Sequence, residues 1–229
     1  MASLHSLAPN LWAIEFRGMS GPVEARYRMT VVRWAGDRLW LHSPIAIDDA
    51  LADELAALGE VSDIIAPNRF HHLHAGSTKQ RYPDACLWAA AGLPPRVPEV
   101  EFDQILGDEP PAWVDEIGLL PLRGVSLSSE VVFHHHASRT LICSDLIANP
   151  HDAANAATRI LWRALGVWQR AGQNHAFRAM IRDPAAMREC VDEILGWEIE
   201  RVVMGHGDIL EVDAKSVLAR ALQHIPKMV

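Results

Sequence analysis

The sequence has 229 residues, 49% of them hydrophobic and 22% charged, and a formal net charge of -8. A chain of this length and composition can bury a full core, and we expect one domain over residues 1–229. The acidic balance, with no run of Lys and Arg, argues against a nucleic-acid partner. No stretch reaches the roughly 18 to 20 apolar residues of a membrane helix, so we expect no membrane partner.

Cysteine usage and the N-terminus bear on the compartment. Cys86, Cys143 and Cys190 are widely spaced and predict neither a disulfide framework nor a cysteine-rich zinc site. The N-terminus has no basic segment followed by an apolar core, so we expect no leader to be removed. Both observations favour a cytoplasmic protein.

Apolar alternation predicts antiparallel sheet in the first forty residues. The expected strands cover residues 11–16, 28–34 and 38–42, and a loop with Gly18, Gly21 and Pro22 joins the first two. Helical spacing then begins, with Asp48 or Asp49 as the N-cap and Gly59 as the end. A short buried strand over residues 61–66 follows. Strand, crossover helix and strand, with a polar loop at the carboxyl end, is the usual geometry of sites in α/β sheets.

The second half of the chain predicts further strands and then helices. We expect a brief strand or helix and a loop within residues 82–98, a loop over 101–113, a short strand near a sheet edge over 117–122, and a hairpin of residues 129–134 and 139–145. Helices are predicted over residues 153–170, from Pro184 and over 213–224, with a last strand at 200–204. The spacing of Ile160, Leu161, Leu165 and Trp168 predicts that the first of these helices is buried.

Metal-capable side chains follow three of the predicted strands. His71, His72 and His74 come soon after the strand at 61–66, Asp145 ends an apolar run, and His206 stands between two glycines after the last strand. Imidazoles and carboxylates are common ligands of zinc and iron, so one shared site is the economical interpretation. Each histidine could also be an ordinary loop residue, which is the expectation for His74, and Asp145 could cap the next helix.

The order of elements resembles the metallo-β-lactamase superfamily over nearly the whole chain. Pro67-Asn68 before His71-His72, then Tyr82-Pro83, then Ser138 to Leu141 leading to Asp145, is similar to a branch known only as a domain of unknown function. The resemblance implies an α+β fold, a four-layer αββα sandwich, with metal at the edge where the loops after the strands converge. Superfamily members hydrolyse β-lactams, thioesters, lactones and phosphodiesters with a metal-activated water.

The residues of the superfamily motif are only partly present. The pattern His-x-His-x-Asp-His falls on Pro67, Arg69, His71 and His72, where only the last position matches. The histidine expected near residues 122–124 is also missing, whereas Asp145 matches the metal-bridging aspartate and His206 the last histidine. The resemblance thus implies half of a two-metal site, with His72, Asp145 and His206 as ligands and His71 as a further candidate.

Arg69 and Glu130 are candidates for catalysis. If Ala137 and Ser138 form the hairpin turn, Glu130 lies opposite Asp145, where it would be a hydrogen-bond acceptor beside the site, a general base, or an exposed strand carboxylate. The same register places His135 about 16 Å away, at about 3.3 Å per residue, so His134, His135 and His136 are expected to be structural. Arg69 would replace the charge of a missing metal, hold an anionic substrate group, or pair with a nearby acid.

The sequence therefore predicts a metal-dependent hydrolase of a small-molecule substrate, with one zinc or iron and a water in an open position. The alternative is a non-catalytic binding or scaffold protein that has kept the fold and lost the metal. A third interpretation is a redox role for an iron centre.

Overall fold

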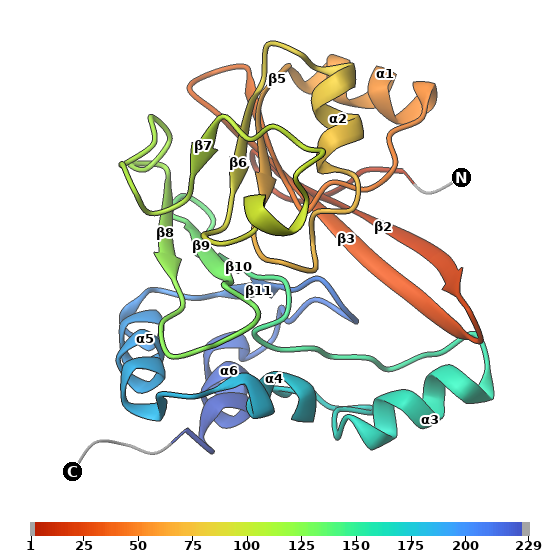
Figure 1. Ribbon diagram of the computed structural model, residues 1–229, viewed down its shortest axis with the longest axis vertical. Coiled ribbons are helices and arrows are strands. Elements are labelled where there is room, and N and C mark those ends of the chain that lie inside the picture. The colour runs from red at the N-terminus through yellow and green to blue at the C-terminus, as the bar shows by residue number, and fades with distance from the viewer. Residues whose placement is uncertain (1–2, 226–229) are drawn as a thin grey trace.

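The computed structural model describes residues 3–225 and contains two β-sheets that face each other, with helices on the outer side of each (Figure 1). The first sheet has seven strands in the order β1 (His5–Ala8), β2 (Leu11–Ser20), β3 (Val23–Trp34), β4 (Arg38–His42), β5 (Glu60–Ala66), β6 (Cys86–Ala89) and β7 (Gln104–Ile105). The second has four strands in the order β11 (Arg201–Val203), β10 (Thr140–Ile142), β9 (Val131–His135) and β8 (Ile117–Pro121). This arrangement confirms the predicted αββα sandwich.

Three clusters of buried apolar side chains hold the layers together. The cluster between the sheets contains Trp40, Ile65, Trp88, Trp113, Phe133 and Ile142. Helices α1 (Asp49–Leu58) and α2 (Ala75–Arg81) pack on the first sheet, and α5 (Pro184–Gly196) and α6 (Ala214–Leu222) pack on the second. Because successive side chains of a strand point to opposite faces, each sheet supplies apolar residues to the central cluster and to one helical layer.

The hairpin of β2 and β3 is longer than expected. The two strands pair antiparallel from Leu11 and Val32 to Ser20 and Val23, and Gly21, at φ 58°, begins the turn. Gly18, expected in a loop, therefore lies within β2. Gly18, Gly21 and Pro22 suggested a loop, whereas the strands continue because Arg26 and Arg28 of β3 are buried and pair with residues in other parts of the fold.

Helix α1 and strand β5 bring the chain to one edge of the first sheet. Asp48 caps α1 by accepting a hydrogen bond from Leu51 N at 2.9 Å, and Gly59 follows the helix, as predicted. Strand β5 runs parallel to β4 and β6. The carboxyl ends of these strands therefore lie at the same edge, where sites form in α/β sheets.

Strands β9 and β10 form the predicted hairpin with the predicted register. His135 pairs with Thr140 and Phe133 with Ile142, and the continued register places Glu130 opposite Asp145. Strand β8 lies at the edge of the second sheet, as expected. Since β11 pairs parallel to β10, the loops after these two strands leave the sheet at the same edge.

The expectation of a buried helix over residues 153–170 is wrong. Helix α3 covers only Ala156–Ala164, and Ile160 and Leu161 are 63% and 38% exposed. Gly166 and Gln169 have φ angles of 78° and 55°, which ends the helical conformation. Apolar spacing shows which stripe of a helix is apolar, but not whether another element lies against it.

The structure also contains elements that the sequence did not predict. These are β1, α2, α4 (His175–Met180), the short strand β7 and a single 3₁₀ turn, η1 (Pro94–Arg96). Helix α2 begins within the histidine-rich segment after β5. Across residues 3–225 no helix has the length and apolar character needed to cross a membrane.

Candidate metal centre

Three side chains meet where the loops after β5, β10 and β11 converge. His71 Nε2 lies 3.2 Å from His206 Nε2 and 3.5 Å from Asp145 Oδ1, and His206 Nε2 lies 3.3 Å from Asp145 Oδ1. Within the described part of the chain, this is the one group of three His, Cys, Asp or Glu side chains placed to share a metal ion. The side chains are 2% (His71), 18% (His206) and 14% (Asp145) exposed, so their ligand atoms face one another rather than bulk water.

The triangle of ligand atoms matches the spacing around zinc. Neighbouring ligands of tetrahedral zinc, with bonds of about 2.0–2.1 Å, stand roughly 3.3–3.4 Å apart. The three distances here are 3.2, 3.3 and 3.5 Å. Two imidazoles and a carboxylate also suit zinc or iron as donors, and three protein ligands leave a position open, as catalytic sites do. The residues present therefore fit one such metal.

Both histidines are held on the side away from the triangle. His206 Nδ1 donates a hydrogen bond to the Arg26 carbonyl oxygen at 2.7 Å, which leaves Nε2 of the neutral ring without a proton. His71 Nδ1 lies 2.7 Å from Ser43 Oγ, a hydroxyl that can accept a hydrogen bond from it. Such partners select the tautomer and the orientation of a ligating histidine.

Asn68 shapes the loop that carries His71. Its Oδ1 accepts hydrogen bonds from the backbone N of Phe70 at 2.8 Å and of His71 at 2.7 Å, which forms a turn typical of asparagine. Its Nδ2 donates to Asp145 Oδ2 at 2.7 Å. One buried amide thus fixes the backbone of one candidate ligand and the carboxylate of another.

Gly205 lets the loop before His206 pass close to His71. A Cβ at this position would lie 2.6 Å from His71 Cε1 and 3.0 Å from the Ser144 carbonyl oxygen. Both distances are shorter than ordinary van der Waals contact, so only glycine fits without a shift of its neighbours.

The electrostatics of the group favour a bound cation. Burial raises the pKa of Asp145, but the imidazoles of His71 and His206 outweigh this effect and hold the pKa below its usual range. Burial lowers the pKa of His206, but the hydrogen bond and negative charge of Asp145 raise the pKa above its usual value. A carboxylate and an imidazole in this relation attract a positive charge, which is either a proton or a metal ion.

Two aromatic rings flank the histidines. The Tyr27 ring centroid lies 6.0 Å from that of His71 and 5.9 Å from that of His206. Trp162 of α3 places its ring 5.9 Å from His206. The group therefore has an aromatic wall from β3 and a second from α3.

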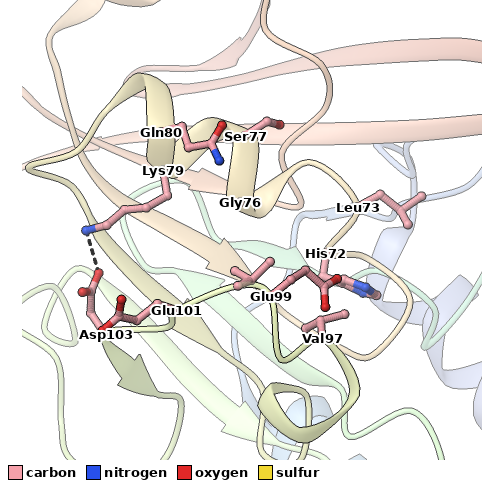
Figure 2. Close-up of a pocket in the computed structure, with 11 residues that line it drawn as sticks. His72, Leu73, Gly76, Ser77, Lys79, Gln80, Val97, Glu99, Glu101 and Asp103 are labelled. Carbon is pink, nitrogen blue, oxygen red and sulfur yellow. Dashed lines mark hydrogen bonds and ion pairs between the residues drawn. The ribbon is translucent and has the colours of Figure 1, made fainter.

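The structure places His72 outside the group. Its ring lines a cavity of about 570 Å³ between α2 and residues 97–103, near Val97 and Glu99 (Figure 2). Adjacent residues of a turn point in different directions, and the turn at Asn68 directs His71, not His72, toward Asp145. The structure therefore brings His71, the further candidate, and not His72 to Asp145 and His206, and the binding of a metal by this group stays a prediction. His74, half-buried at the start of α2, also lies outside the group.

Arg69 has no carboxylate partner among residues 3–225, so the ion pair, one of its three alternatives, is absent there. Its guanidinium lies against Gly92, where a Cβ would stand 2.3 Å from Arg69 Nη2. Its Nε is buried without a hydrogen-bond partner in the described structure. The role of Arg69 in holding an anionic substrate group stays a prediction.

Glu130 accepts a hydrogen bond from the backbone of Asp145. Its side chain is fully buried, and Oε1 accepts hydrogen bonds from Ser144 N at 2.7 Å and Asp145 N at 2.9 Å. Burial and the charge of Asp145 raise the pKa of Glu130 to about 8. The interpretation as an exposed strand carboxylate is therefore wrong. The contacts match the acceptor role, and the role of general base stays a prediction.

The three consecutive histidines at the end of β9 and in its turn contact residues outside the candidate metal group. His134 Nε2 donates to the Glu198 carbonyl oxygen at 2.8 Å, and His135 Nδ1 lies 2.7 Å from Ser138 Oγ. The observed register separates them from the metal group along the hairpin, as predicted.

Sequence reasoning missed Tyr27, Ser43, Trp162 and the carbonyl of Arg26. Their contacts join segments that are far apart in the sequence, so no local pattern predicts them. Only Asn68 carried a local signal, because an asparagine after Pro67 is typical of turns.

The comparisons with known proteins agree with this fold. Residues 9–177 match the family described as Domain of unknown function (DUF4336). No curated protein matches the chain. A metallo-β-lactamase from Hirschia baltica is 12% identical, with a TM-score of 0.65 over 99% of each chain.

Two further structures give the same result. One from Erythrobacter litoralis, with beta mercaptoethanol in the active site, is 12% identical with a TM-score of 0.65, over 97% of this chain and 96% of that one. The metallo-β-lactamase FIM-1 from Pseudomonas aeruginosa, in its mono-zinc form, is 13% identical with a TM-score of 0.62, over 97% and 95%. Such identities establish the fold and leave activity open. The chain has the metallo-β-lactamase fold and belongs to the DUF4336 family, a domain of unknown function.

Proposed function

We propose that this protein is a metal-dependent hydrolase of a small-molecule substrate, with one zinc or iron held by His71, Asp145 and His206. The observation that carries the proposal is the triangle of ligand atoms with sides of 3.2, 3.3 and 3.5 Å. A metal bound there would supply a Lewis acid and lower the pKa of a water molecule. The protein contributes the fixed orientation of both imidazoles and of the carboxylate.

Support for a single metal comes from the residues around the triangle. Pro67 and Arg69 stand where the superfamily has histidines, and neither side chain can ligate a metal at neutral pH. The fold itself accommodates one metal, since FIM-1 is described in a mono-zinc form. Tyr27 and Trp162 would bound the space in which the substrate lies.

The test begins with metal content, because it does not depend on a guessed substrate. The protein is stripped with a chelator and titrated with Zn²⁺, Co²⁺ and Fe²⁺. We expect about one equivalent to bind, His71→Ala to lower the affinity at least about 10-fold, and the matched control His72→Ala to keep it. The loaded protein is then assayed on β-lactam, thioester, lactone and phosphodiester substrates. Hydrolysis by the wild type and not by His71→Ala would support the proposal.

Three other outcomes of these measurements would contradict the proposal. A wild-type protein that binds no metal would favour the non-catalytic binding or scaffold protein, in which the proton between Asp145 and His206 takes the place of a metal. A visible absorption band in the iron-loaded protein that changes with a reductant would favour the redox role. Loss of metal in His72→Ala but not in His71→Ala would reverse the ligand assignment.

A further inference from the structure

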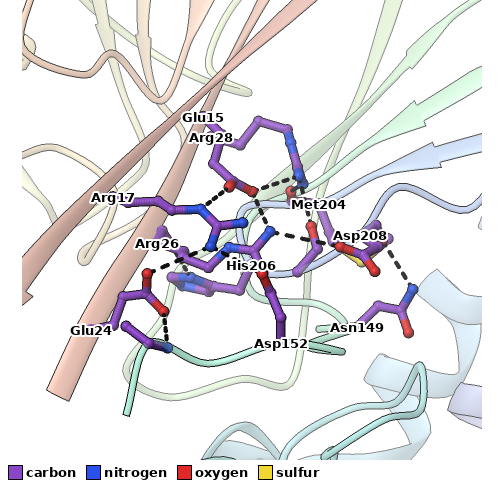
Figure 3. Close-up of polar contacts among 12 residues, drawn as sticks. Glu15, Arg17, Glu24, Arg26, Arg28, Asn149, Asp152, Met204, His206 and Asp208 are labelled. Carbon is purple, nitrogen blue, oxygen red and sulfur yellow. Dashed lines mark hydrogen bonds and ion pairs between the residues drawn. The ribbon is translucent and has the colours of Figure 1, made fainter. Parts of the chain in front are cut away.

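We propose that Arg28 is a positioning residue that sets His206 for metal binding, an inference that rests on the proposed function. Arg28 lies on β3 and is only 5% exposed. Its Nη1 donates to the Met204 carbonyl oxygen at 2.6 Å, and its Nη2 donates to the Gly207 carbonyl oxygen at 2.7 Å (Figure 3). The guanidinium thus holds the backbone on both sides of His206.

The same strand fixes the imidazole itself. The carbonyl oxygen of Arg26, two residues before Arg28, accepts the hydrogen bond from His206 Nδ1 at 2.7 Å. Glu15 of β2 joins the two arginines, with Oε2 lying 2.6 Å from Arg26 Nη2 and 3.1 Å from Arg28 Nη2. Residues of β3 therefore hold both the backbone of the His206 loop and the His206 ring.

These hydrogen bonds from β3 matter because the proposed metal ligands come from two sheets. His71 follows β5 of the first sheet and is held by Ser43, which follows β4. The His206 loop follows β11 of the second sheet, where Gly205 N donates to the Ser144 carbonyl oxygen at 3.1 Å. Contacts within the second sheet cannot set the distance between His71 and His206. Arg28 belongs to the first sheet and binds the second-sheet loop on both sides of His206, so together with the Arg26 carbonyl it sets that distance.

A guanidinium suits this task better than other side chains. Its planar fork presents several N–H donors in fixed directions and can reach two carbonyl groups at once while it pairs with a carboxylate. A lysine ammonium keeps the charge but offers no such geometry. Arg28→Lys should therefore retain the fold and lose part of the positioning.

The experiment compares four forms of the full chain: wild type, Arg28→Lys, Arg28→Met and Arg33→Met. Arg33 is the matched control on the same strand, because it contacts Asn10 Oδ1 and lies over the Trp12 ring, away from the His206 loop. The first readout is the imidazole N–H signal of His206 in metal-free protein by NMR, assigned by its loss in His206→Ala. The second is the affinity for Co²⁺ by competition with a chelator, together with the visible spectrum of the bound Co²⁺.

We expect Arg28→Met to broaden or shift the His206 N–H signal and to lower the Co²⁺ affinity about 10- to 100-fold. Arg28→Lys should fall between it and the wild type, and Arg33→Met should match the wild type in both readouts. If Arg28→Met does not fold, Arg28→Lys decides with the same measurements. A wild-type signal and affinity in the folded Arg28 variants, or an equal loss in Arg33→Met, would overturn the inference. Failure of the wild type to bind Co²⁺ would refute the proposed function instead, and the NMR comparison would still decide on Arg28.

Discussion

Adding a single methyl group at Gly205 should disable the metal centre without unfolding the protein. A Cβ there would lie 2.6 Å from His71 Cε1, whereas ordinary contact begins at 3.4 Å, so the ring would have to retreat by about 0.8 Å. The loop cannot move the other way, since the same Cβ would lie 3.0 Å from the Ser144 carbonyl oxygen, which is backbone. Ligand distances in metal sites tolerate only about 0.2 Å. We therefore expect Gly205→Ala to lower Zn²⁺ affinity at least about 10-fold.

The assay is a chelator competition for Zn²⁺, with thermal unfolding measured on the same samples. Gly196→Ala is the matched control, because a Cβ there meets nothing within 4 Å and the residue ends α5. This control should keep the wild-type affinity and unfold at the same or a slightly higher temperature. Folded Gly205→Ala with wild-type affinity for Zn²⁺ would refute the placement of Gly205 against His71.

Three further predictions follow from the contacts described above. Asn68→Ala removes the hydrogen bonds that hold the His71 loop and Asp145, so it should lower the free energy of unfolding by about 1–3 kcal/mol in urea denaturation; an unchanged value would contradict this account of the turn. Burial and then the charge of His71 lower the pKa of His42 to about 3. As the pH falls below about 6.5, this histidine is therefore protonated in the unfolded chain but stays neutral in the folded protein. The free energy of unfolding should therefore fall between about pH 6.5 and 3, by up to about 1.4 kcal/mol per pH unit, and His42→Phe should flatten this slope; an equally steep slope would show that other groups cause it. Ile160→Glu should change the free energy of unfolding by less than about 0.5 kcal/mol, because this side chain is 63% exposed. A loss of several kcal/mol would instead support the prediction from the sequence that this helix is buried.

Local patterns predicted the elements that carry the site. The runs before Asp145 and His206 are apolar and lead to those residues, the run before His71 stops at Pro67, and these runs became β10, β11 and β5. The hairpin register could be predicted because a two-residue turn leaves one pairing, and this placed Glu130 beside Asp145. Such features depend on residues close together in the chain.

Features that depend on distant partners could not be predicted. His71 and His72 are chemically equal neighbours, and the choice between them is made by Asn68, whose partner Asp145 is 77 residues away. The second half of β2 was predicted as a loop from Gly18 and the following Gly21 and Pro22, and the salt bridges of Glu15 and Arg17 with Arg26 and Asp152 could not be read from the sequence. Helix α3 has the apolar stripe of a buried helix, yet Ile160 and Leu161 of that stripe are exposed.

The position of β11 late in the chain has a consequence for how relatives are sorted. The family match ends at residue 177, within α4, whereas His206 follows β11. A relative recognised over that stretch alone can share His71 and Asp145 and still lack the third donor. Whether such a relative keeps the three donors proposed here must be read from the segment that comes after the match, where an imidazole should follow a strand parallel to the counterpart of β10. That one side chain is the feature to check in each relative before the proposal made here is extended to it.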